Sequence, residues 1–221
     1  MYKQEVTISL DDITLKANLV IPDDARGIVI FSHGSGSSRF SSRNNYVADV
    51  LNNQNIATLL VDLLSPAEDN ESENRFNIPL LTGRLVKVTE WIRRNDQLKN
   101  LPPGYFGAST GAASALLAAA KLNNDIKTVV SRGGRPDLAT DALPQVQCPV
   151  LLIVGSLDTQ VIHLNKKAYS ELKCEKKIEI VEGASHLFEE PGTLDKVAHI
   201  ATAWFEQHLG MPEFLSRHVN L

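Results

Sequence analysis

The chain has 221 residues, of which 43% are hydrophobic and 22% are charged, a composition close to the average for globular proteins. This composition excludes a disordered, collagen-like or coiled-coil chain, and the length is sufficient for one sizeable hydrophobic core. The formal net charge of −4 and the pI of about 5.9 argue against nucleic-acid binding, which normally requires a basic surplus.

The amino terminus and the cysteines indicate the compartment. Residues 1–5 (MYKQE) lack the apolar segment of a signal peptide, and the apolar runs elsewhere are far too short to cross a bilayer. Cys148 and Cys174 belong to no metal-ligand pattern. One disulfide between them stays open, but two reduced thiols in a reducing compartment are the simpler interpretation. The sequence therefore predicts a cytoplasmic protein without membrane association.

The first half of the chain alternates between strand and helix patterns. Residues 5–10 and 14–20 alternate apolar and polar side chains and predict an opening hairpin that turns at Asp11-Asp12. The next predicted elements, in chain order, are a buried strand at 28–32, a helix at about 43–53, a buried strand at 57–62 and a helix from Asn77, its expected N-cap, to about Arg94, with Pro79 in its first turn. Before that helix, the acidic residues 65–77 (SPAEDNESENRFN) predict an excursion over the surface.

The second half continues the alternation. Its predicted elements, in chain order, are a strand at 105–106, a helix at 109–122, strands at 126–131 and 150–155, a helix at 163–172, a strand at 177–181 and a helix at 194–209. Repeated strand–helix–strand units imply an α/β fold with a mostly parallel sheet and helices on both faces. We predict a single domain over residues 1–210 and a peripheral tail over 211–221.

The segment 105–111 (YFGASTG) contains a G-x-S-x-G pattern centred on Ser109. This pattern is typical of a strand that turns sharply into a helix and lifts a strained serine clear of the sheet. Gly107 and Gly111 leave room for the tight crossing, and the pattern here lies between an apolar strand and an alanine-rich helix, as it must. The alternative is an ordinary helix start with Ser109 as its N-cap. We predict that Ser109 is a nucleophile.

A serine nucleophile needs a base and an acid that orients the base, and the sequence supplies both after later strands. Asp158 and His186 each follow a predicted strand, and the chain order Ser109, Asp158, His186 is that of an α/β-hydrolase triad. Asp137, after the strand at 126–131, is the competing acid. Four further histidines in predicted helices or in the tail are expected to be surface or packing residues: His163, His199, His208 and His218.

The loop after the third strand, 31–38 (FSHGSGSS), is rich in glycine and serine. A hydrolase needs backbone N–H groups aimed at the developing oxyanion, and glycines let the backbone approach closely. We predict that the N–H groups of Ser35 and Thr110 form the oxyanion hole. The rival interpretation is a dinucleotide fingerprint that begins Gly34-x-Gly36, but Arg39 stands where its third glycine should fall.

With these residues assigned, the chain resembles the α/β-hydrolase superfamily, specifically its dienelactone-hydrolase-like branch. The resemblance covers nearly the whole chain. Its carriers are the His33-Gly34 loop, the elbow at 107–111, the turn at 155–158 and the histidine loop at 185–188. The run 130–137 (VSRGGRPD) is similar to that of small bacterial hydrolases that also occur fused to phosphoribosyltransferase domains. The resemblance implies an acyl-enzyme mechanism on a small-molecule ester, lactone or thioester, with no metal and no organic cofactor.

One residue departs from this family pattern. Dienelactone hydrolases proper carry a cysteine at the elbow, whereas this chain has Ser109, so general carboxylesterase chemistry is the safer expectation. Neither Cys148 nor Cys174 lies on a strand-to-helix turn. A non-catalytic small-molecule-binding protein on the same fold is the alternative function, since fold does not fix function.

Substrate recognition is less marked in the sequence. Arg132 follows a strand whose carboxyl end borders the expected site and, like His33, is a candidate substrate-binding residue. Arg132 and Arg135 could equally pair with Asp137 or Asp141, or hold a loop in place. Among partners, a homodimer and a functional link to a phosphoribosyltransferase stay open.

Overall fold

A computed structural model describes residues 1–11 and 13–210 of the protein, which fold around an eight-stranded sheet. The strands are β1 (Tyr2–Ser9), β2 (Thr14–Ile21), β3 (Ile28–Ser32), β4 (Ala57–Val61), β5 (Pro103–Ala108), β6 (Val129–Arg132), β7 (Val150–Gly155) and β8 (Lys176–Val181). The helices are α1 (Ser42–Asn53), α2 (Pro66–Asp69), α3 (Ile78–Arg94), α4 (Thr110–Leu122), α5 (Thr159–Glu171) and α6 (Thr193–His208). Short 3-10 helices cover η1 (Ser72–Phe76), η2 (Asn123–Asp125) and η3 (Pro136–Gln145).

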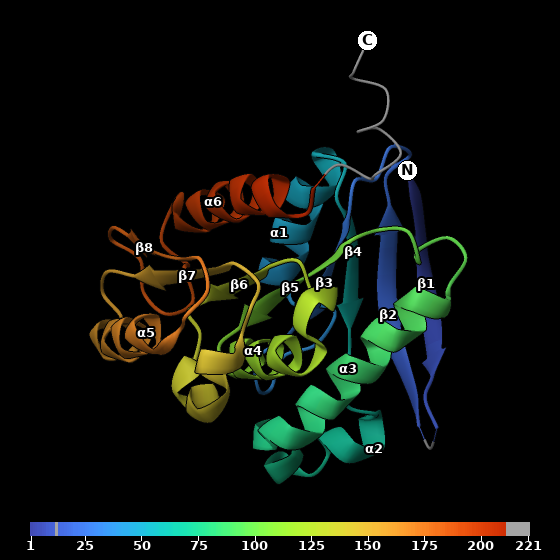
Figure 1. Cartoon of the computed structure of the whole chain (residues 1–221), viewed down its shortest axis with the longest axis horizontal. Coiled ribbons are helices and arrows are strands. Elements are labelled where there is room, and N and C mark those ends of the chain that lie inside the picture. The colour runs from blue at the N-terminus through green and yellow to red at the C-terminus, as the bar shows by residue number, and fades with distance from the viewer. Residues whose placement is uncertain (12, 211–221) are drawn as a thin grey trace.

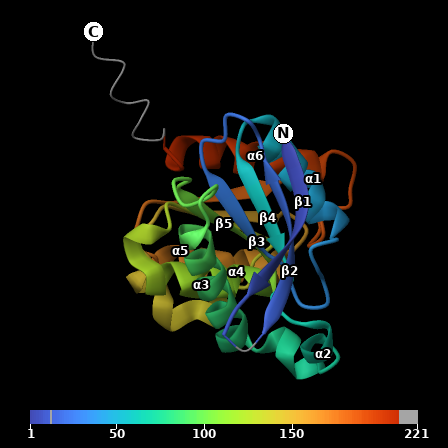
Figure 2. The ribbon, with the colours of Figure 1, turned by 90° about the vertical axis from the view of Figure 1, so that its right-hand side faces the viewer.

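The sheet runs in the order β1-β2-β4-β3-β5-β6-β7-β8. β1 pairs with β2 and β2 with β4 in antiparallel fashion, and every other pairing is parallel. The predicted opening hairpin and mostly parallel sheet are therefore confirmed. Figure 2 shows the hairpin of β1 and β2 at one edge of the sheet.

Helices cover both faces of the sheet, as Figure 1 shows, with α1 and α6 on one side and α3, α4 and α5 on the other. Each side has its own apolar core. Strands β3, β4 and β7 lie between the two cores and are buried at every position, because both of their faces are covered. In β1 and β2 burial alternates, so that Val6 and Ile8 point inward while their neighbours face solvent.

The structure confirms one expectation about the loops and helices and corrects two others. The segment 65–77 is at the surface, but it is ordered into α2 and η1 because Ser65 and Glu68 form a reciprocal capping box around Pro66. Helix α5 begins at Thr159, four residues earlier than expected, and residues 136–145 form a 3-10 helix that the sequence analysis missed. The predicted tail at 211–221 lies outside the described residues. None of the described helices is long and apolar enough to span a membrane.

Helix α4 passes very close to the backbone where it crosses the ends of β3 and β5. A Cβ on Gly111 would lie 2.1 Å from the carbonyl oxygen of Ser32, and one on Gly107 would lie 2.5 Å from the Cα of Ala112. Both obstacles are backbone atoms, which cannot rotate away as a side chain can. The crossing therefore depends on two positions without a side chain, as the sequence predicted.

Gly111→Ala is expected to lower the free energy of unfolding by roughly 3 kcal/mol, because the added methyl group overpacks against the backbone. Urea denaturation of the variant and the wild type measures the difference. The matched control is Gly83→Ala inside α3, where a Cβ would meet nothing within 4 Å. There alanine should raise the free energy of unfolding by roughly 0.5–1 kcal/mol. A Gly111→Ala protein as stable as the wild type would contradict the close crossing.

Candidate active site

Ser109 occupies the turn between β5 and α4 in a strained conformation. Its φ of 51° and ψ of −120° are rare for a residue with a side chain. Although Ser109 is at the N-cap position of α4, its side chain makes no capping hydrogen bond. The ordinary N-cap interpretation is therefore wrong, since the hydroxyl is not used to satisfy the helix end.

The turn at 132–135, which follows β6, holds the backbone of Ser109 from both sides. The N–H of Ser109 donates to the carbonyl of Arg132 at 3.1 Å, and the N–H of Arg135 donates to the carbonyl of Ser109 at 3.0 Å. These two bonds stabilise the strained backbone of the elbow.

Asp158 and His186 meet across the carboxyl ends of β7 and β8. His186 Nδ1 lies 2.6 Å from Asp158 Oδ2, with the aspartate side chain mostly buried and the imidazole 38% exposed. Asp158 is at the N-cap position of α5, yet its carboxylate makes no capping bond and is directed to His186 instead. The loops that carry the pair are joined by the backbone, since the N–H of Leu157 donates to the carbonyl of Ala184 at 2.9 Å.

Ser109 and His186 flank the same turn. A Cβ on Gly133 would lie 3.5 Å from both Cε1 and Nδ1 of His186, so the imidazole packs against the turn that holds the Ser109 backbone. Gly133 has a φ of 51°, which favours glycine, and it presents no side chain to the ring. The structure thus brings Ser109, His186 and Asp158 to the carboxyl ends of the parallel strands.

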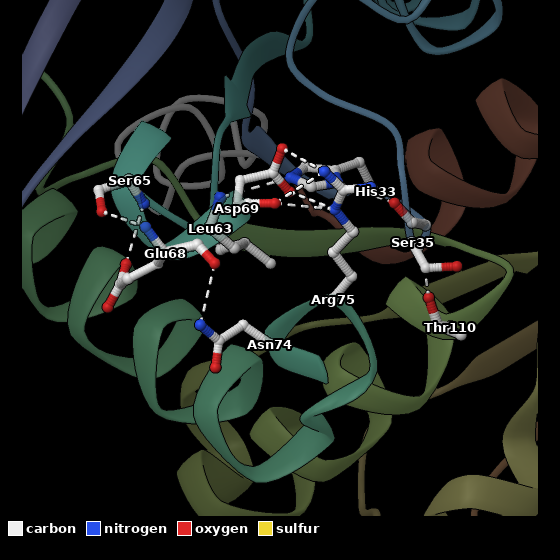
Figure 3. Close-up of polar contacts among 10 residues, drawn as sticks. His33, Ser35, Leu63, Ser65, Glu68, Asp69, Asn74, Arg75 and Thr110 are labelled. Atoms are coloured by element: carbon white, nitrogen blue, oxygen red, sulfur yellow. Dashed lines mark hydrogen bonds and ion pairs between the residues drawn. The ribbon is translucent and has the colours of Figure 1, made fainter. Parts of the chain in front are cut away.

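The loop 33–38 lies directly against the elbow. A Cβ on Gly34 would lie 3.2 Å from Cβ of Ser109. Thr110 is the first residue of α4, so its N–H has no carbonyl four residues earlier within the helix. The N–H of Ser35 donates to Oγ1 of Thr110 at 2.9 Å, and this bond, drawn in Figure 3, fastens the loop to the helix. The sequence analysis expected the Ser35 N–H in the oxyanion hole, whereas in this structure the Thr110 hydroxyl accepts it.

His33 connects the same loop to the end of β4. Its Nδ1 lies 3.0 Å from the carbonyl oxygen of Gly34, and its Nε2 lies 3.4 Å from the N–H of Leu63. Because a backbone N–H can only donate, Nε2 is the acceptor and Nδ1 carries the proton in a neutral ring. Both ring nitrogens of His33 thus have protein partners, which favours a structural role over substrate binding.

Residues 15–215 match the profile of the dienelactone hydrolase family. The chain belongs to the dienelactone hydrolase family. A dienelactone hydrolase from Anabaena variabilis ATCC 29413 is 50% identical, with a TM-score of 0.93 over 95% of this chain and 99% of its own. Est1E from Butyrivibrio proteoclasticus shares the α/β-hydrolase fold at 17% identity, with a TM-score of 0.79 over 92% of this chain and 98% of its own.

Longer relatives are also known. Two Mycobacterium tuberculosis proteins, from strains CDC 1551 / Oshkosh and H37Rv, carry the provisional name phosphoribosyl transferase and are 50% identical over 209 residues. The match covers 95% of this chain and 47% of theirs, so this chain spans about half the length of these curated relatives.

Neither cysteine of this dienelactone hydrolase family member is placed to act as a nucleophile. Cys148 and Cys174 precede the amino-terminal ends of β7 and β8, whereas Ser109 follows the carboxyl end of β5. Both thiols are free. Burial raises the pKa of the Cys148 thiol to about 12 and also raises that of Cys174, so both stay protonated near neutral pH. Among the described residues, no three His, Cys, Asp or Glu side chains cluster as metal ligands would.

Asp137 and Arg135 form a pair of their own. Arg135 Nε and Nη2 donate to the two carboxylate oxygens of Asp137 at 2.8 and 2.7 Å. Asp137 is therefore committed to an arginine, whereas Asp158 is committed to His186. The pairing of Arg135 with Asp137 was one of the alternatives left open by the sequence.

The remaining histidines are not part of the Asp158–His186 pair. His163 and His199 are exposed, and His208 packs on the ring of Trp204 with the ring centroids 4.3 Å apart. His218 lies outside the described part of the chain. None of the three described side chains competes with His186 for a position beside the elbow.

A cavity of about 320 Å³ opens beside the 33–40 loop. Its walls come from this loop, from the ends of β2 and β4, and from Ser65, Pro66 and Asp69 of the acidic segment. Arg75 holds Asp69 there through a two-pronged ion pair, visible in Figure 3. The acidic segment thus borders a pocket next to His33. The S-x-x-E spacing of Ser65 and Glu68 was the overlooked sequence signal for its ordered structure.

The Asp137 pair predicts a pH dependence of stability. The hydrogen bonds from Arg135 hold the pKa of the Asp137 carboxyl below its ordinary value. A lowered folded-state pKa contributes stability above the unfolded pKa of about 4, and this contribution is lost as the pH falls through the folded pKa. Asp137→Asn should therefore be less stable than the wild type at pH 7, and the difference should shrink at more acidic pH.

Melting temperatures of both proteins between pH 7 and pH 3 measure this effect. Asp24→Asn, which removes an exposed carboxylate, is the control and should follow the wild type throughout. A constant difference between Asp137→Asn and the wild type at all pH values would show that the ion pair is not its source.

Proposed function

We propose that this protein is a serine hydrolase that cleaves a carboxylic ester, lactone or thioester, with Ser109 as nucleophile, His186 as base and Asp158 as the acid that orients it. The observation that carries the proposal is the strained Ser109 elbow, which shares the 132–135 turn with an imidazole already bonded to a carboxylate. Family membership and the dienelactone hydrolase of Anabaena variabilis support hydrolysis of ester bonds. The mechanism uses side chains and backbone groups of this chain and calls for no cofactor.

In the first step Nε2 of His186 takes the proton of the Ser109 hydroxyl while the oxygen attacks the acyl carbonyl carbon. The C=O bond becomes a single bond and the oxygen bears the negative charge. When this intermediate collapses, the bond to the leaving oxygen or sulfur breaks and His186 returns the proton to it. Asp158, bonded to Nδ1, stabilises the imidazolium between these events. The product is an acyl-Ser109 ester.

In the second step His186 takes a proton from water, whose oxygen attacks the acyl-enzyme carbonyl carbon. The resulting intermediate expels Ser109 Oγ, which recovers the proton from His186. The acid is released and the enzyme returns to its starting state.

The developing oxyanion is stabilised by backbone N–H groups in this proposal. The Thr110 N–H at the first turn of α4 is one donor, and the partial positive charge of the helix end supports it. The Ser35 N–H is the second donor, and it shares or exchanges its bond to the Thr110 hydroxyl when the oxyanion forms. The glycine at position 34 lets the loop approach the elbow at this point.

The longer relatives suggest how the domain is used. Because this chain matches about half of proteins named phosphoribosyl transferases, we propose that the hydrolase works with a phosphoribosyltransferase, fused or separate.

A homodimer, which the sequence left open, would have twice the chain mass of 24.3 kDa. Light scattering on the purified chain measures this mass.

A fluorophosphonate probe tests the activated serine. The wild type should gain one adduct by intact-mass spectrometry, and Ser109→Ala should gain none. Turnover of a p-nitrophenyl ester by Ser109→Ala should fall by roughly 10⁴-fold or more, with circular dichroism and melting temperature preserved. No adduct on the folded wild type would contradict the proposal, and a non-catalytic binding protein would then be the better interpretation.

The acid is tested by two matched substitutions. Asp158→Asn should lower kcat by roughly 10³- to 10⁴-fold, because the asparagine no longer stabilises the imidazolium or its correct tautomer. Asp137→Asn, which removes the same charge from the Arg135 pair, should keep most of the wild-type kcat. The reverse result would assign the acid to Asp137.

A further inference from the structure

β8 is the last strand of the sheet, and no described strand lies on its outer side, as Figure 1 shows. Its six residues run in unbroken register with β7, without a bulge that would disturb the outer edge. Ile180 is among the exposed large apolar side chains, at 40%. A regular strand edge of this kind carries backbone N–H and C=O groups that can pair with the edge of another chain.

The pairing with β7 fixes which residues of β8 direct their backbone groups outward. The carbonyl of Glu175 accepts the N–H of Val150 at 2.9 Å, and the bonds of a parallel ladder then repeat at every second residue. Lys176, Ile178 and Ile180 therefore direct their N–H and C=O groups away from β7. These groups lie at the regular spacing that the addition of a further strand requires.

The side chains of Lys177 and Glu179 lie on the face of the sheet that α6 covers. They form an ion pair at 2.7 Å, with the lysine 59% and the glutamate 32% exposed. Together with Ile200 and Trp204 of α6 they line a groove of about 190 Å³. The outer edge of β8 thus presents one accessible charge of each sign, two residues apart and on the same face.

The order Lys-Ile-Glu at 177–179 is complementary to itself in an antiparallel pair. With Ile178 of two copies directly opposite each other, Lys177 of each copy faces Glu179 of the other. The two adjacent registers that keep outward backbone groups opposite each other place lysine against lysine or glutamate against glutamate. Opposite charges directly across two strands stabilise the pair and like charges destabilise it, so the charges select one register.

The same register satisfies the backbone. In an antiparallel ladder, directly opposite residues alternate between pairs that exchange two hydrogen bonds and pairs that exchange none. Ile178 directs both of its backbone groups outward, so the two copies of Ile178 form a hydrogen-bonded pair. Lys177 and Glu179 then form the pairs without hydrogen bonds, in which side chains lie closest.

We propose that this edge is an interface between two copies of this chain, in which β8 pairs with β8 in antiparallel fashion. A two-fold axis perpendicular to the sheet passes between the two Ile178 residues, and the two sheets become continuous. Both copies use the same surface, as a closed dimer requires. The proposal gives the homodimer its interface, and it holds whether or not Ser109 is a nucleophile.

The other edge strand, β1, is less suited to this pairing. It also carries a lysine and a glutamate two residues apart, Lys3 and Glu5. Glu5 is already bound within the chain, however, by Arg39 at 2.8 Å and Lys16 at 3.6 Å. In β8 the ion pair within one strand is exchanged for the same ion pair between strands, so the pairing leaves neither charge without a partner.

The competing explanation is that the lysines of β8 keep other strands away, since lysine on an edge strand is a common protection against aggregation. Lys176 does not stand in the way of pairing, because its Nζ donates to the carbonyl of Leu172 at 2.6 Å and lies over the ring of Tyr169. A protective role predicts a monomer at every concentration. The proposed interface predicts a dimer that forms as the concentration rises.

Sedimentation equilibrium over a range of concentrations measures the association. The wild type should approach twice the chain mass of 24.3 kDa. Glu179→Lys and Lys177→Glu should each raise the dimer dissociation constant roughly 10-fold or more, because like charges then face each other at two symmetric positions. Lys3→Glu, the same charge reversal on β1, is the control and should dimerise as the wild type does.

A mixture of the two variants separates an interface from a structural effect. When Glu179→Lys and Lys177→Glu are mixed in equal amounts, each lysine again faces a glutamate, and a mixed dimer should form. A defect within one chain would not be repaired by the other variant. Failure of the mixture to associate would therefore overturn the proposal.

A cross-link tests the register. Ile178→Cys places two cysteines directly opposite each other with their Cα atoms about 5.5 Å apart, within the range of a disulfide. With diamide as oxidant this variant should give a covalent dimer on a non-reducing gel. Lys177→Cys, whose cysteines are not opposite each other, and the wild type, which keeps Cys148 and Cys174, should not. Melting temperatures confirm that the variants are folded.

Three results would overturn the proposal. The first is a wild type that is monomeric at the highest concentration measured; protection of the Ile178 amide from hydrogen exchange in such a monomer would show that another segment of the same chain covers the edge. The second is a dimer that Lys3→Glu dissociates and Glu179→Lys does not, which would place the interface at β1. The third is a cross-link as efficient in Lys177→Cys as in Ile178→Cys.

Discussion

The crossing of α4 over the ends of β3 and β5 is the contact on which the rest of the site depends. Backbone meets backbone there, because Gly107 and Gly111 have no side chains to separate the strand from the helix. The chain must turn within one residue, and Ser109 adopts the strained conformation that this turn requires. The cost is of order 1–3 kcal/mol, and the packing of both cores around the crossing offsets it. A looser crossing would allow an ordinary helix start and a serine used as a cap.

The neighbouring loops are arranged around that elbow through their backbones. The 132–135 turn bonds both the N–H and the carbonyl of Ser109, and Gly133 leaves space for the imidazole of His186. The 33–38 loop is fastened by the bond from Ser35 to Thr110 and by the ring of His33. Each of these bonds involves at least one backbone group, so the loops are fixed at their main chain. Such fixed geometry is what electrostatic stabilisation of an oxyanion requires.

The polar side chains around the site differ in what already satisfies them, and this difference separates their roles. Both carboxylate oxygens of Asp137 accept hydrogen bonds from Arg135, and Asp62 accepts one from the N–H of Arg39. Both carboxylates therefore have structural roles. Asp158 stands at the N-cap position of α5 but bonds His186 and does not cap the helix. Arg132 and Arg43 keep unused donors in a buried place.

The amino-acid sequence by itself determined the order of strands and helices, the opening hairpin and the elbow, because these depend on local periodicity and on glycine at fixed positions. It also named Ser109, Asp158 and His186 as candidates, since each follows a recognisable strand. It could not show that Asp158 faces His186 while Asp137 faces Arg135, nor that the Ser35 N–H is held by Thr110. Those pairings join residues on different elements, and only the tertiary structure decides which carboxylate reaches which partner. The same holds for Arg132, because only the packing around it shows that it has no carboxylate partner among the described residues.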